Sequence, residues 1–413
     1  MKNRVNKNRI DYREDTNMTN KDIAERGQKV VMNTYGRFPI APVKGKGSYV
    51  WDADGKQYLD FIGGIAVCAL GHCHDELQQV IRQQAASLWH VSNLYWIEPQ
   101  VRLAEKLVSI SGLDKAFFCN SGAEANEAAI KLARKYFYRQ QESGRTQIIV
   151  FNESFHGRTL ATLTATGQKK YQEGFAPLPS GFVYADFNNL ASVEKLISDD
   201  TAAIMIEPIQ GEGGVHPADT VFLNSLRRIC DREGILLIFD EVQCGVGRSG
   251  NFMAYQNYQV KPDIVTMAKG LGGGFPIGAM LASEKAAGGF APGDHASTFG
   301  GNPLATAVAD RVVELVSAPA FLDNVNKAGR SLKESLQSIQ DERMVTVRGR
   351  GLMLGAEFNT PIKDLVTICM HNGLLLLGAG ANVMRFVPPL NINETEINQA
   401  VAIFKKSLRE WKV

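Results

Sequence analysis

The sequence predicts an α/β protein with a mostly parallel, doubly wound sheet between helices, followed by a smaller α+β domain. Short runs rich in Ile and Val alternate with segments of helical periodicity from residue 115 to residue 270. Such runs, bounded by Gly and Pro, are typical of strands buried in a parallel sheet. Beyond about Ala307 this alternation stops, and helical segments are followed by strand-like segments of a different type. The change in pattern predicts a second domain.

Length and composition allow two domains and exclude several classes of protein. The 413 residues are 45% hydrophobic and 21% charged, and the formal net charge is +2. This near-neutral balance argues against a protein whose main surface binds nucleic acid. No apolar run approaches the length of a membrane-spanning helix, so we expect no membrane partner. Six cysteines without a CxxC pair fit a reducing cytoplasm.

The amino-terminal part predicts a leader, a helix and a hairpin. Residues 1–20 are polar and of mixed charge, and we expect a disordered leader there. A short helix is expected over 21–35, and the alternating segment 48–61, with a turn at Asp54-Gly55, predicts a hairpin. The expected division is a leader at 1–20, a segment packing with the small domain at 21–60, the large domain at 61–306 and the small domain at 307–413.

Further along the chain, periodicity predicts the remaining elements in order. Helices are expected at 75–89, 98–110, 123–140, 219–233, 302–317, 321–338 and 361–372. Segments that contain strands are expected at 115–122, 146–159, 181–187, 202–214, 235–243, 263–270, 344–358 and 383–389. The apolar run from Ile277 to Leu281 follows Lys269 too closely for a helical crossover. We therefore expect it to be an antiparallel strand.

Ionisable residues gather where the predicted strands end. Asp240 and Gln243 follow one apolar run, and Lys269 follows the next. The carboxyl ends of parallel strands meet at one edge of the sheet, where α/β proteins bind ligands. A lysine enclosed there can lose its proton and attack an aldehyde, and an aspartate can keep a pyridinium nitrogen protonated. The alternative for the pair is a plain salt bridge.

Two further segments suit a ligand that carries both an aldehyde and a pyridinium ring. Ser121-Gly122-Ala123-Glu124 stands between a strand and a helix, where free backbone amides suit a phosphate, although the same pattern also caps ordinary helices. Phe155 would stack on a flat ring or pack in the core. A phosphate loop, a stacking ring, an acid and a lysine occur in the order that pyridoxal phosphate would need.

These residues resemble a known family. DEVQCGVGRSG at 240–250 and PDIVTMAKGLGGGFPIGAM at 262–280 resemble the signature of the class III, pyridoxal-phosphate-dependent aminotransferases of fold type I. The resemblance extends from about Tyr35 through Leu390 and implies a mostly parallel seven-stranded sheet in the large domain. The segments NSGAEANEAAIKLAR, FHGRT, IEPIQGEGG, STFGGNPLA and VMRFVPPL are most similar to the branch that acts on N-acetylornithine.

The resemblance implies roles in holding the cofactor. Lys269 would bind the cofactor aldehyde covalently and later move a proton, Asp240 would pair with the ring nitrogen, and Gln243 would reach the ring hydroxyl. Thr298 would complete the phosphate site of the neighbouring subunit, which implies a homodimer with shared active sites. The cofactor-binding residues implied are Gly122, Ala123, Phe155, Asp240, Glu241, Val242, Gln243, Lys269 and Thr298.

The resemblance also implies residues that bind substrate. Arg158 would receive the carboxylate of N-acetylornithine, and Arg385 would bind the α-carboxylate of 2-oxoglutarate or glutamate; guanidinium groups suit carboxylates because they donate two parallel hydrogen bonds. Glu212 would cover Arg385 while the ω-amino substrate is bound. Ser297 would lie near the substrate, and Tyr35 occupies a position that contacts ornithine in related enzymes. The alternatives are a surface role for Arg158 and Glu212 and a salt bridge for Arg385.

The resulting hypothesis is an enzyme of arginine biosynthesis. It would transfer the ω-amino group of N2-acetyl-L-ornithine to 2-oxoglutarate, giving N-acetyl-L-glutamate 5-semialdehyde and L-glutamate. The alternatives are an ω-aminotransferase acting on ornithine, 4-aminobutyrate or succinyldiaminopimelate, an aminomutase, and a nucleotide-binding oxidoreductase or non-catalytic binding protein. We expect no metal site, because Gly71-His72-Cys73-His74 is not followed by a second cluster with zinc spacing.

Overall fold

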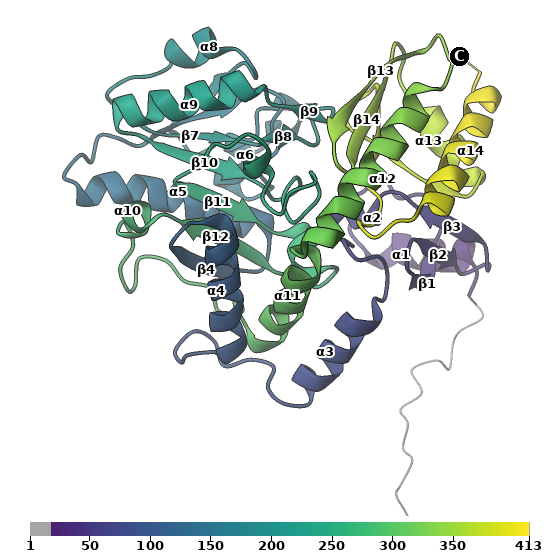
Figure 1. The fold of residues 1–413 in the computed structure, drawn as a ribbon, viewed down its shortest axis with the longest axis horizontal. Helices are drawn as coiled ribbons and strands as arrows, with labels where there is room; N and C mark the ends of the chain where they lie inside the picture. The colour runs from purple at the N-terminus through teal and green to yellow at the C-terminus, as the bar shows by residue number, and fades with distance from the viewer. Residues whose placement is uncertain (1–17, 413) are drawn as a thin grey trace, which may run out of the picture.

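A seven-stranded sheet forms the larger part of the molecule (Figure 1). The structure is a computed structural model and describes residues 18–412. The strand order of the seven-stranded sheet is β4-β12-β11-β10-β7-β5-β6. Only β12 runs antiparallel to its neighbours β11 and β4, so the antiparallel strand expected at Ile277–Leu281 is confirmed. The seven-stranded, mostly parallel sheet is confirmed as well.

The elements of this part begin with α3 and end with α11. The strands are β4 (Lys115–Cys119), β5 (Gln147–Phe151), β6 (Phe182–Ala185), β7 (Thr201–Ile206), β8 (Ile209–Gln210), β9 (His216–Pro217), β10 (Leu236–Asp240), β11 (Ile264–Met267) and β12 (Gly278–Ala282). The helices are α3 (Asp75–Ala85), α4 (Glu98–Ser111), α5 (Gly122–Arg139), α6 (Leu160–Ala165), α7 (Lys169–Gln172), α8 (Leu190–Glu194), α9 (Thr220–Glu233), η1 (Ala254–Asn257), η2 (Lys269–Gly272), α10 (Glu284–Ala287) and α11 (Pro303–Val316).

Helices cover both faces of the sheet, and alternation along each strand decides which face a side chain meets. Leu236 and Ile238 of β10 pack in the core that contains α5, whereas Leu237 and Phe239 pack in the core that contains α9. Successive residues of a strand point to opposite faces, so Asp240 continues the series on the α5 side. The strand register thereby directs this carboxylate toward α5.

The rest of the chain forms a smaller α/β region beside the large sheet (Figure 1). One sheet has the order β13-β14-β17-β16 and another the order β1-β2-β3-β15, so the amino-terminal strands join the carboxyl-terminal part. The elements are α1 (Asn20–Val30), β1 (Pro42–Lys46), β2 (Tyr49–Asp52), β3 (Gln57–Asp60), α2 (Gly63–Ala66), α12 (Pro319–Gln337), β13 (Met344–Arg350), β14 (Met353–Phe358), α13 (Lys363–His371), β15 (Leu374–Leu375), β16 (Leu377–Gly378), β17 (Val383–Phe386) and α14 (Glu394–Glu410).

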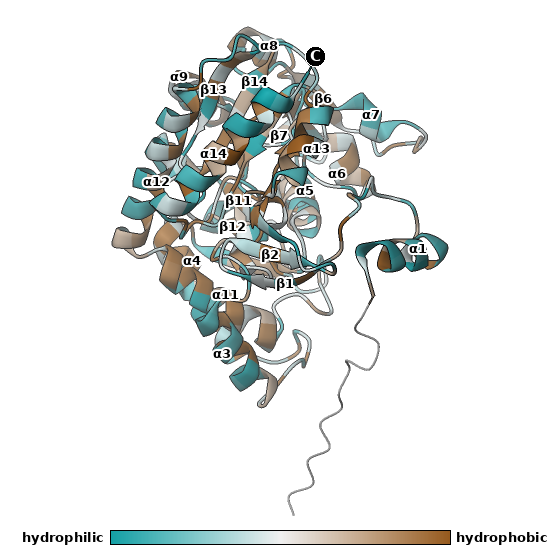
Figure 2. Ribbon diagram, turned by 90° about the vertical axis from the view of Figure 1, so that its right-hand side faces the viewer, coloured by the Kyte–Doolittle hydropathy of each residue, from teal (hydrophilic) through white to brown (hydrophobic). Residues whose placement is uncertain are grey.

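Several boundaries differ from the sequence predictions. The strand-like segment at 344–358 is two antiparallel strands, because Gly351 adopts a left-handed conformation (φ 56°) between them. Helix α1 ends at Val30, and α3 ends at Ala85. Residues 1–17 of the expected leader lie outside the described residues, whereas Thr19 and Asn20 cap and begin α1. Figure 2 shows α1 standing away from the body of the molecule, and none of its residues is buried.

Across residues 18–412, no helix combines the length and the apolar character that crossing a lipid bilayer requires.

Candidate active site

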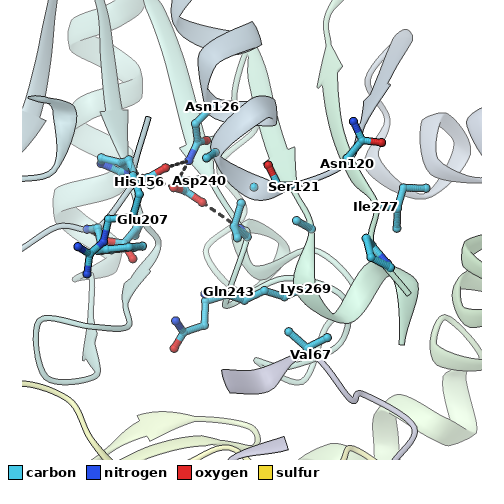
Figure 3. Close-up of a pocket in the computed structure, with 18 of the residues that line it drawn as sticks. Val67, Asn120, Ser121, Asn126, His156, Glu207, Asp240, Gln243, Lys269 and Ile277 are labelled. Carbon is cyan, nitrogen blue, oxygen red and sulfur yellow. Dashed lines mark hydrogen bonds and ion pairs between the residues drawn. The ribbon is translucent and has the colours of Figure 1, made fainter. Parts of the chain in front are cut away.

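The carboxyl ends of the parallel strands meet at a cavity of about 410 Å³ (Figure 3). Asp240 ends β10, Glu207 follows β7, and Lys269 follows β11 after one intervening residue. The first turn of α5 closes the cavity from the side of β4. The lining residues are Val67, Asn120, Ser121, Gly122, Ala123, Asn126, Phe155, His156, Gly157, Arg158, Glu207, Asp240, Val242, Gln243, Ala268, Lys269, Gly274, Phe275, Pro276 and Ile277.

Asp240 is buried and held by three donors. Its Oδ2 accepts hydrogen bonds from Asn126 Nδ2 and His156 Nδ1, each at 2.7 Å, and its Oδ1 accepts from the backbone amide of Val242 at 2.9 Å. Asn126 is in turn fixed by Thr266, whose hydroxyl donates to Asn126 Oδ1 at 2.6 Å. This network fixes the orientation of the carboxylate.

Lys269 lies opposite this carboxylate in the cavity. It begins η2 with a positive φ of 42°, an unusual conformation for a residue other than glycine. Burial lowers the pKa of Lys269, the Glu212 carboxylate opposes that effect, and the Arg385 guanidinium adds to it. The amine is therefore easier to deprotonate than a surface lysine, as nucleophilic attack on an aldehyde requires.

The start of α5 offers an anion site beside these two residues. Ser121 caps the helix by accepting the Glu124 amide, so the amides of Gly122 and Ala123 have no carbonyl partner within the helix. A β-carbon at Gly122 would lie 2.6 Å from a methyl group of Val242. A glycine is needed here because the helix start and the segment after β10 approach so closely. Free amides and the helix dipole together favour a phosphate.

Phe155 and Arg158 lie on the loop after β5. Phe155 lines the cavity, and its ring meets Tyr171 edge-on with centroids 5.7 Å apart. The exposed Arg158 guanidinium lies 5.6 Å from the Phe155 ring centre and 4.3 Å from that of Tyr171. It is thus held at the cavity by two aromatic rings, with its charge free to meet an anion.

Glu207 is a buried acid in the cavity wall. Its Oε2 accepts the Phe155 amide at 3.0 Å, and its Oε1 accepts the Gly211 amide at 3.3 Å. Burial raises the pKa of Glu207 to about 7, against the opposing effect of His156. Glu207 lies in the strand-containing segment expected at 202–214, and no role was predicted for it from the sequence.

Arg385 reaches the same region from β17 of the other sheet. Its side chain is 1% exposed, and its Nη1 donates to Glu212 and, at 2.9 Å, to Gln243 Oε1. Gln243 Nε2 donates to the same Glu212 oxygen at 3.1 Å. Arg385 Nε and Nη2 are buried without a hydrogen-bond partner. Unpaired guanidinium donors of this kind are costly, so the site is suited to a carboxylate ligand.

Six predicted site residues lie outside the cavity lining: Arg385 and Glu212, described above, and Glu241, Ser297, Thr298 and Tyr35. The Glu241 carboxylate accepts the amides of Ala254 and Tyr255 at 2.6 and 2.7 Å. This carboxylate lies on the opposite side of the strand end from Asp240. The cofactor contact predicted for Glu241 stays a prediction. Ser297 contacts the cavity residue Asn120, whose Nδ2 donates to its hydroxyl at 3.3 Å. Thr298 is exposed beside it, and Tyr35 is 71% exposed under the Arg37 guanidinium.

Two residues of the network were not found from the sequence. Asn126 lies inside the NSGAEAN segment and Thr266 inside the strand before Lys269. Both appear as ordinary element residues unless the packing of α5 on β10 and β11 is known. An asparagine on the buried face of a helix was the one available signal, because buried amides require partners.

Pyridoxal phosphate fits this set of residues. A rigid carboxylate, a lysine of lowered pKa, a flat aromatic side chain and an anion-binding helix start face one cavity. Each matches one functional part of that cofactor: the ring nitrogen, the aldehyde, the ring face and the phosphate.

Comparisons with known proteins agree with this geometry. The family profile described as Aminotransferase class-III matches residues 30–408. The acetylornithine aminotransferase of Thermosynechococcus vestitus is 51% identical over 92% of this chain and 95% of its own length. The succinylornithine transaminase of Photorhabdus laumondii is 49% identical over 90% of this chain and 94% of its own. The crystal structure of Toxoplasma gondii ornithine aminotransferase superposes with a TM-score of 0.92 at 31% identity, covering 95% of this chain and 96% of the other.

Proposed function

The chain belongs to the class-III aminotransferases, and we propose that it transfers the ω-amino group of N2-acetyl-L-ornithine to 2-oxoglutarate. The products would be N-acetyl-L-glutamate 5-semialdehyde and L-glutamate, in arginine biosynthesis. As a member of this family, the protein is a transaminase that depends on pyridoxal phosphate. The single observation that carries the substrate proposal is the close similarity, over almost the whole chain, to acetylornithine aminotransferases.

Four groups are suited to hold the cofactor. The Gly122 and Ala123 amides would bind its phosphate, Phe155 would cover its ring, and Asp240 would pair with its ring nitrogen. Lys269 would hold its aldehyde carbon. When bound, pyridoxal phosphate supplies an electron-withdrawing ring that stabilises negative charge on the substrate carbon.

Lys269 would have a second task in the reaction. Its Nζ, with the lowered pKa caused by burial, would take a proton from the substrate carbon and return one elsewhere. The hydrogen bonds from Asn126 and His156 keep Asp240 in one orientation during the reaction. The carboxylate that would pair with the ring nitrogen therefore does not need to reorganise.

Arg385 and Glu212 would let one cavity accept two kinds of amine. With Glu212 in place, the guanidinium is covered, and a substrate can present its ω-amine. When 2-oxoglutarate or glutamate binds, its α-carboxylate would replace Glu212 and use the unpaired Nε and Nη2 donors. Arg158 would receive the other carboxylate, which is the α-carboxylate in N-acetylornithine and the side-chain carboxylate in 2-oxoglutarate.

A homodimer would complete this site. The segment at 89–96 carries exposed aromatic side chains, including Trp96, which is 94% exposed. Phe299, the residue after Thr298, is also exposed. Asn93 Nδ2 donates to the carbonyl oxygens of Ser297 and Gly300 at 2.9 and 2.8 Å, which ties the two segments together. Apolar patches of this kind mark protein interfaces. In this proposal Thr298 binds the cofactor phosphate in the active site of the partner subunit. Ser297 lies near the substrate, and Tyr35 contacts the substrate.

The proposal also covers the cellular compartment and the domain organisation of the protein. The free state of all six cysteines fits action in the cytoplasm. We keep the division into a large domain at 61–306 and a small domain formed by 21–60 and 307–413, with the boundary at 306 lying inside α11 and α2 lying at the junction of the two domains.

A two-substrate assay tests the activity. Purified holoenzyme would be given 2-oxoglutarate and, separately, N-acetylornithine, ornithine, 4-aminobutyrate and succinyldiaminopimelate, with glutamate formation measured. We expect kcat/KM for N-acetylornithine to exceed that for ornithine at least tenfold. A higher value for ornithine would refute the substrate, and turnover without 2-oxoglutarate would indicate an aminomutase instead.

N-succinylornithine is a second candidate substrate. The 49% identity to a succinylornithine transaminase favours it, and a succinyl group adds one carboxylate to the acyl end. The same assay with both acylated ornithines separates the candidates, and the preferred amino donor is the one with the higher kcat/KM.

A further inference from the structure

The acid that covers Arg385 is carried by a small hairpin. Glu212 lies in the connection 211–215 between β8 and β9, which pair as antiparallel strands. We call residues 211–215 the covering loop. The strand β9 contacts β13 of the small sheet, and the hairpin lies between the two parts of the molecule (Figure 1). A two-stranded hairpin is marginally stable by itself, so the position of the covering loop depends on what holds it.

Arg348 and Arg385 lie in one row across the small sheet. Arg348 of β13 is opposite Gly355 of β14, and Gly355 is opposite Arg385 of β17. Residues directly opposite one another in a sheet point to the same face. A β-carbon at Gly355 would lie 3.0 Å from the β-carbon of Val215, so this glycine leaves room for the fully buried Val215. The covering loop therefore rests on the sheet between the two arginines.

Arg348 binds the backbone of the covering loop. Its Nε donates to the carbonyl oxygens of Gly214 and Val215 at 3.0 and 3.2 Å, and its Nη2 donates to that of Gly214 at 2.7 Å. Its Nη1 donates to the carboxylate of Glu357 on β14, which holds the guanidinium group in place. A guanidinium group suits this task because its donors form a rigid fork.

His216 of β9 adds a contact to the same guanidinium group. Arg348 Nη2 lies 3.1 Å from His216 Nε2, which must accept because arginine only donates. Burial and the nearby Arg348 guanidinium lower the pKa of His216, so the imidazole is neutral and can accept at neutral pH. All three guanidinium nitrogens of Arg348 thus donate to protein atoms, whereas Arg385 Nε and Nη2 have no partner among residues 18–412. The contrast gives Arg385 the donors for a ligand and leaves Arg348 to hold the loop.

We propose that Arg348 is a positioning residue that holds the covering loop on the small sheet and thereby keeps Glu212 over Arg385. Arg348 is not among the residues that line the active-site cavity, so it acts through Glu212. When the loop carbonyls lose this partner, Glu212 covers Arg385 less of the time, and the α-carboxylate of glutamate gains access. The inference rests on the proposed function, because there Glu212 selects between the two kinds of amine.

The first test measures the order of the covering loop. Holoenzyme without substrate is compared by hydrogen–deuterium exchange, read by mass spectrometry on peptides that cover 208–217. R348M removes the donors and keeps an apolar side chain. R350M is the matched control, because Arg350, two residues further along β13, contacts Asn257 and Tyr258 instead.

The two variants should differ clearly in this measurement. We expect exchange in 208–217 to be about tenfold faster in R348M than in wild type and unchanged in R350M, since local opening controls amide exchange. If R348M does not fold, R348K, which keeps the charge and loses the fork, should give an acceleration of about threefold. Exchange equal to that of wild type in the folded variant would overturn the proposal.

The second test measures selection between the two amines. The second-order rate constants of the half-reactions with glutamate and with N-acetylornithine are determined for wild type, R348M, E212Q and the double variant. We expect R348M to raise the ratio of glutamate to N-acetylornithine about three- to fivefold, and the double variant to match E212Q within about twofold, because residues that act through one another are not additive. An unchanged ratio in R348M, or effects that multiply in the double variant, would refute the action through Glu212.

The two tests separate this inference from the proposed function. A wild-type enzyme that does not react with N-acetylornithine would refute the proposed substrate. The exchange measurement needs no substrate and would still decide whether Arg348 holds the covering loop. Faster exchange in R348M without any change in selection would refute the step from the loop to Glu212.

Discussion

Two cationic side chains reach the active site from different parts of the molecule, and their surroundings have opposite effects on them. Lys269 comes from the large parallel sheet, where burial lowers its pKa, and it lies across the cavity from the fixed carboxylate of Asp240. Arg385 comes from the small antiparallel sheet, almost fully buried, with Glu212 paired to it and two donors left unpaired. The first cation is prepared to lose a proton. The second stays charged and is covered by an acid that a ligand can replace.

The difference follows from side-chain chemistry. A lysine amine can be deprotonated within the physiological range when it is buried, whereas a guanidinium remains charged in proteins. Acid–base and nucleophilic work therefore belongs with Lys269, and carboxylate recognition belongs with Arg385. The large sheet supplies chemistry common to a family of substrates, and the small sheet supplies selection among them.

Replacing the reactive lysine should have the largest effect. In Lys269→Ala we expect kcat to fall about 10⁴-fold or more, because both the covalent attachment and the proton transfer are lost. Lys261→Ala, an exposed lysine before the same strand, is the control and should be unaffected. Steady-state glutamate formation measures both. Parental activity in Lys269→Ala would contradict the assignment of nucleophilic and acid–base chemistry to Lys269.

Replacing the recognition arginine should give a smaller and selective loss. In Arg385→Lys we expect kcat/KM for 2-oxoglutarate to fall about 100-fold, because bidentate hydrogen bonding to a carboxylate contributes about 1.5–3 kcal/mol per charged bond. The half-reaction with N-acetylornithine should change less than about threefold. Single-turnover absorbance changes separate the two half-reactions. Equal losses in both would show that Arg385 is a general structural residue.

Removing the covering acid should change preference more than rate. Glu212→Gln keeps the shape but loses the charge that pairs with Arg385, so the guanidinium becomes available to any α-carboxylate. We expect the ratio of kcat/KM for glutamate to that for N-acetylornithine to rise about five- to tenfold. An unchanged ratio, measured on the same enzyme preparation, would refute the covering role.

The smallest effect should be seen at Glu241, on stability alone. Burial raises the pKa of Glu241 to about 8, so between about pH 4.5 and pH 8 the folded protein binds a proton that the unfolded chain releases. Stability then falls as pH rises, by up to about 1.4 kcal/mol per pH unit. Glu241→Gln cannot ionise and should start less stable at pH 5, with a gap to wild type that narrows toward pH 8. Parallel denaturation profiles would contradict this.

The sequence predicted the large sheet well and the second region less well. Buried runs such as Leu236–Asp240 have a simple pattern, and their order along the chain already implied a shared edge. The last helix, α14, was not predicted, although Asn393 and Glu396 form a capping box that signalled it. The pair Gly63-Gly64 is a turn signal, but nothing in the sequence indicated that the left-handed conformation extends to Ile65 and Ala66.

The site was predictable where residues follow strands and unpredictable where it depends on packing. Asp240 and Lys269 could be placed because strand ends converge. Strict alternation along β10 predicts that the Glu241 side chain points to the other side of the strand end from Asp240, where the structure places it. Asn126 and Thr266 support Asp240 only because α5 lies across β10 and β11, which a single sequence does not state.

The most direct test of the account is to find which residue holds the cofactor. Holoenzyme would be reduced with borohydride, digested, and mapped by mass spectrometry. The account predicts a yellow protein that loses its colour on reduction, with the reduced cofactor fixed to the peptide containing Lys269. A colourless protein after incubation with pyridoxal phosphate, or a label on another lysine, would contradict it.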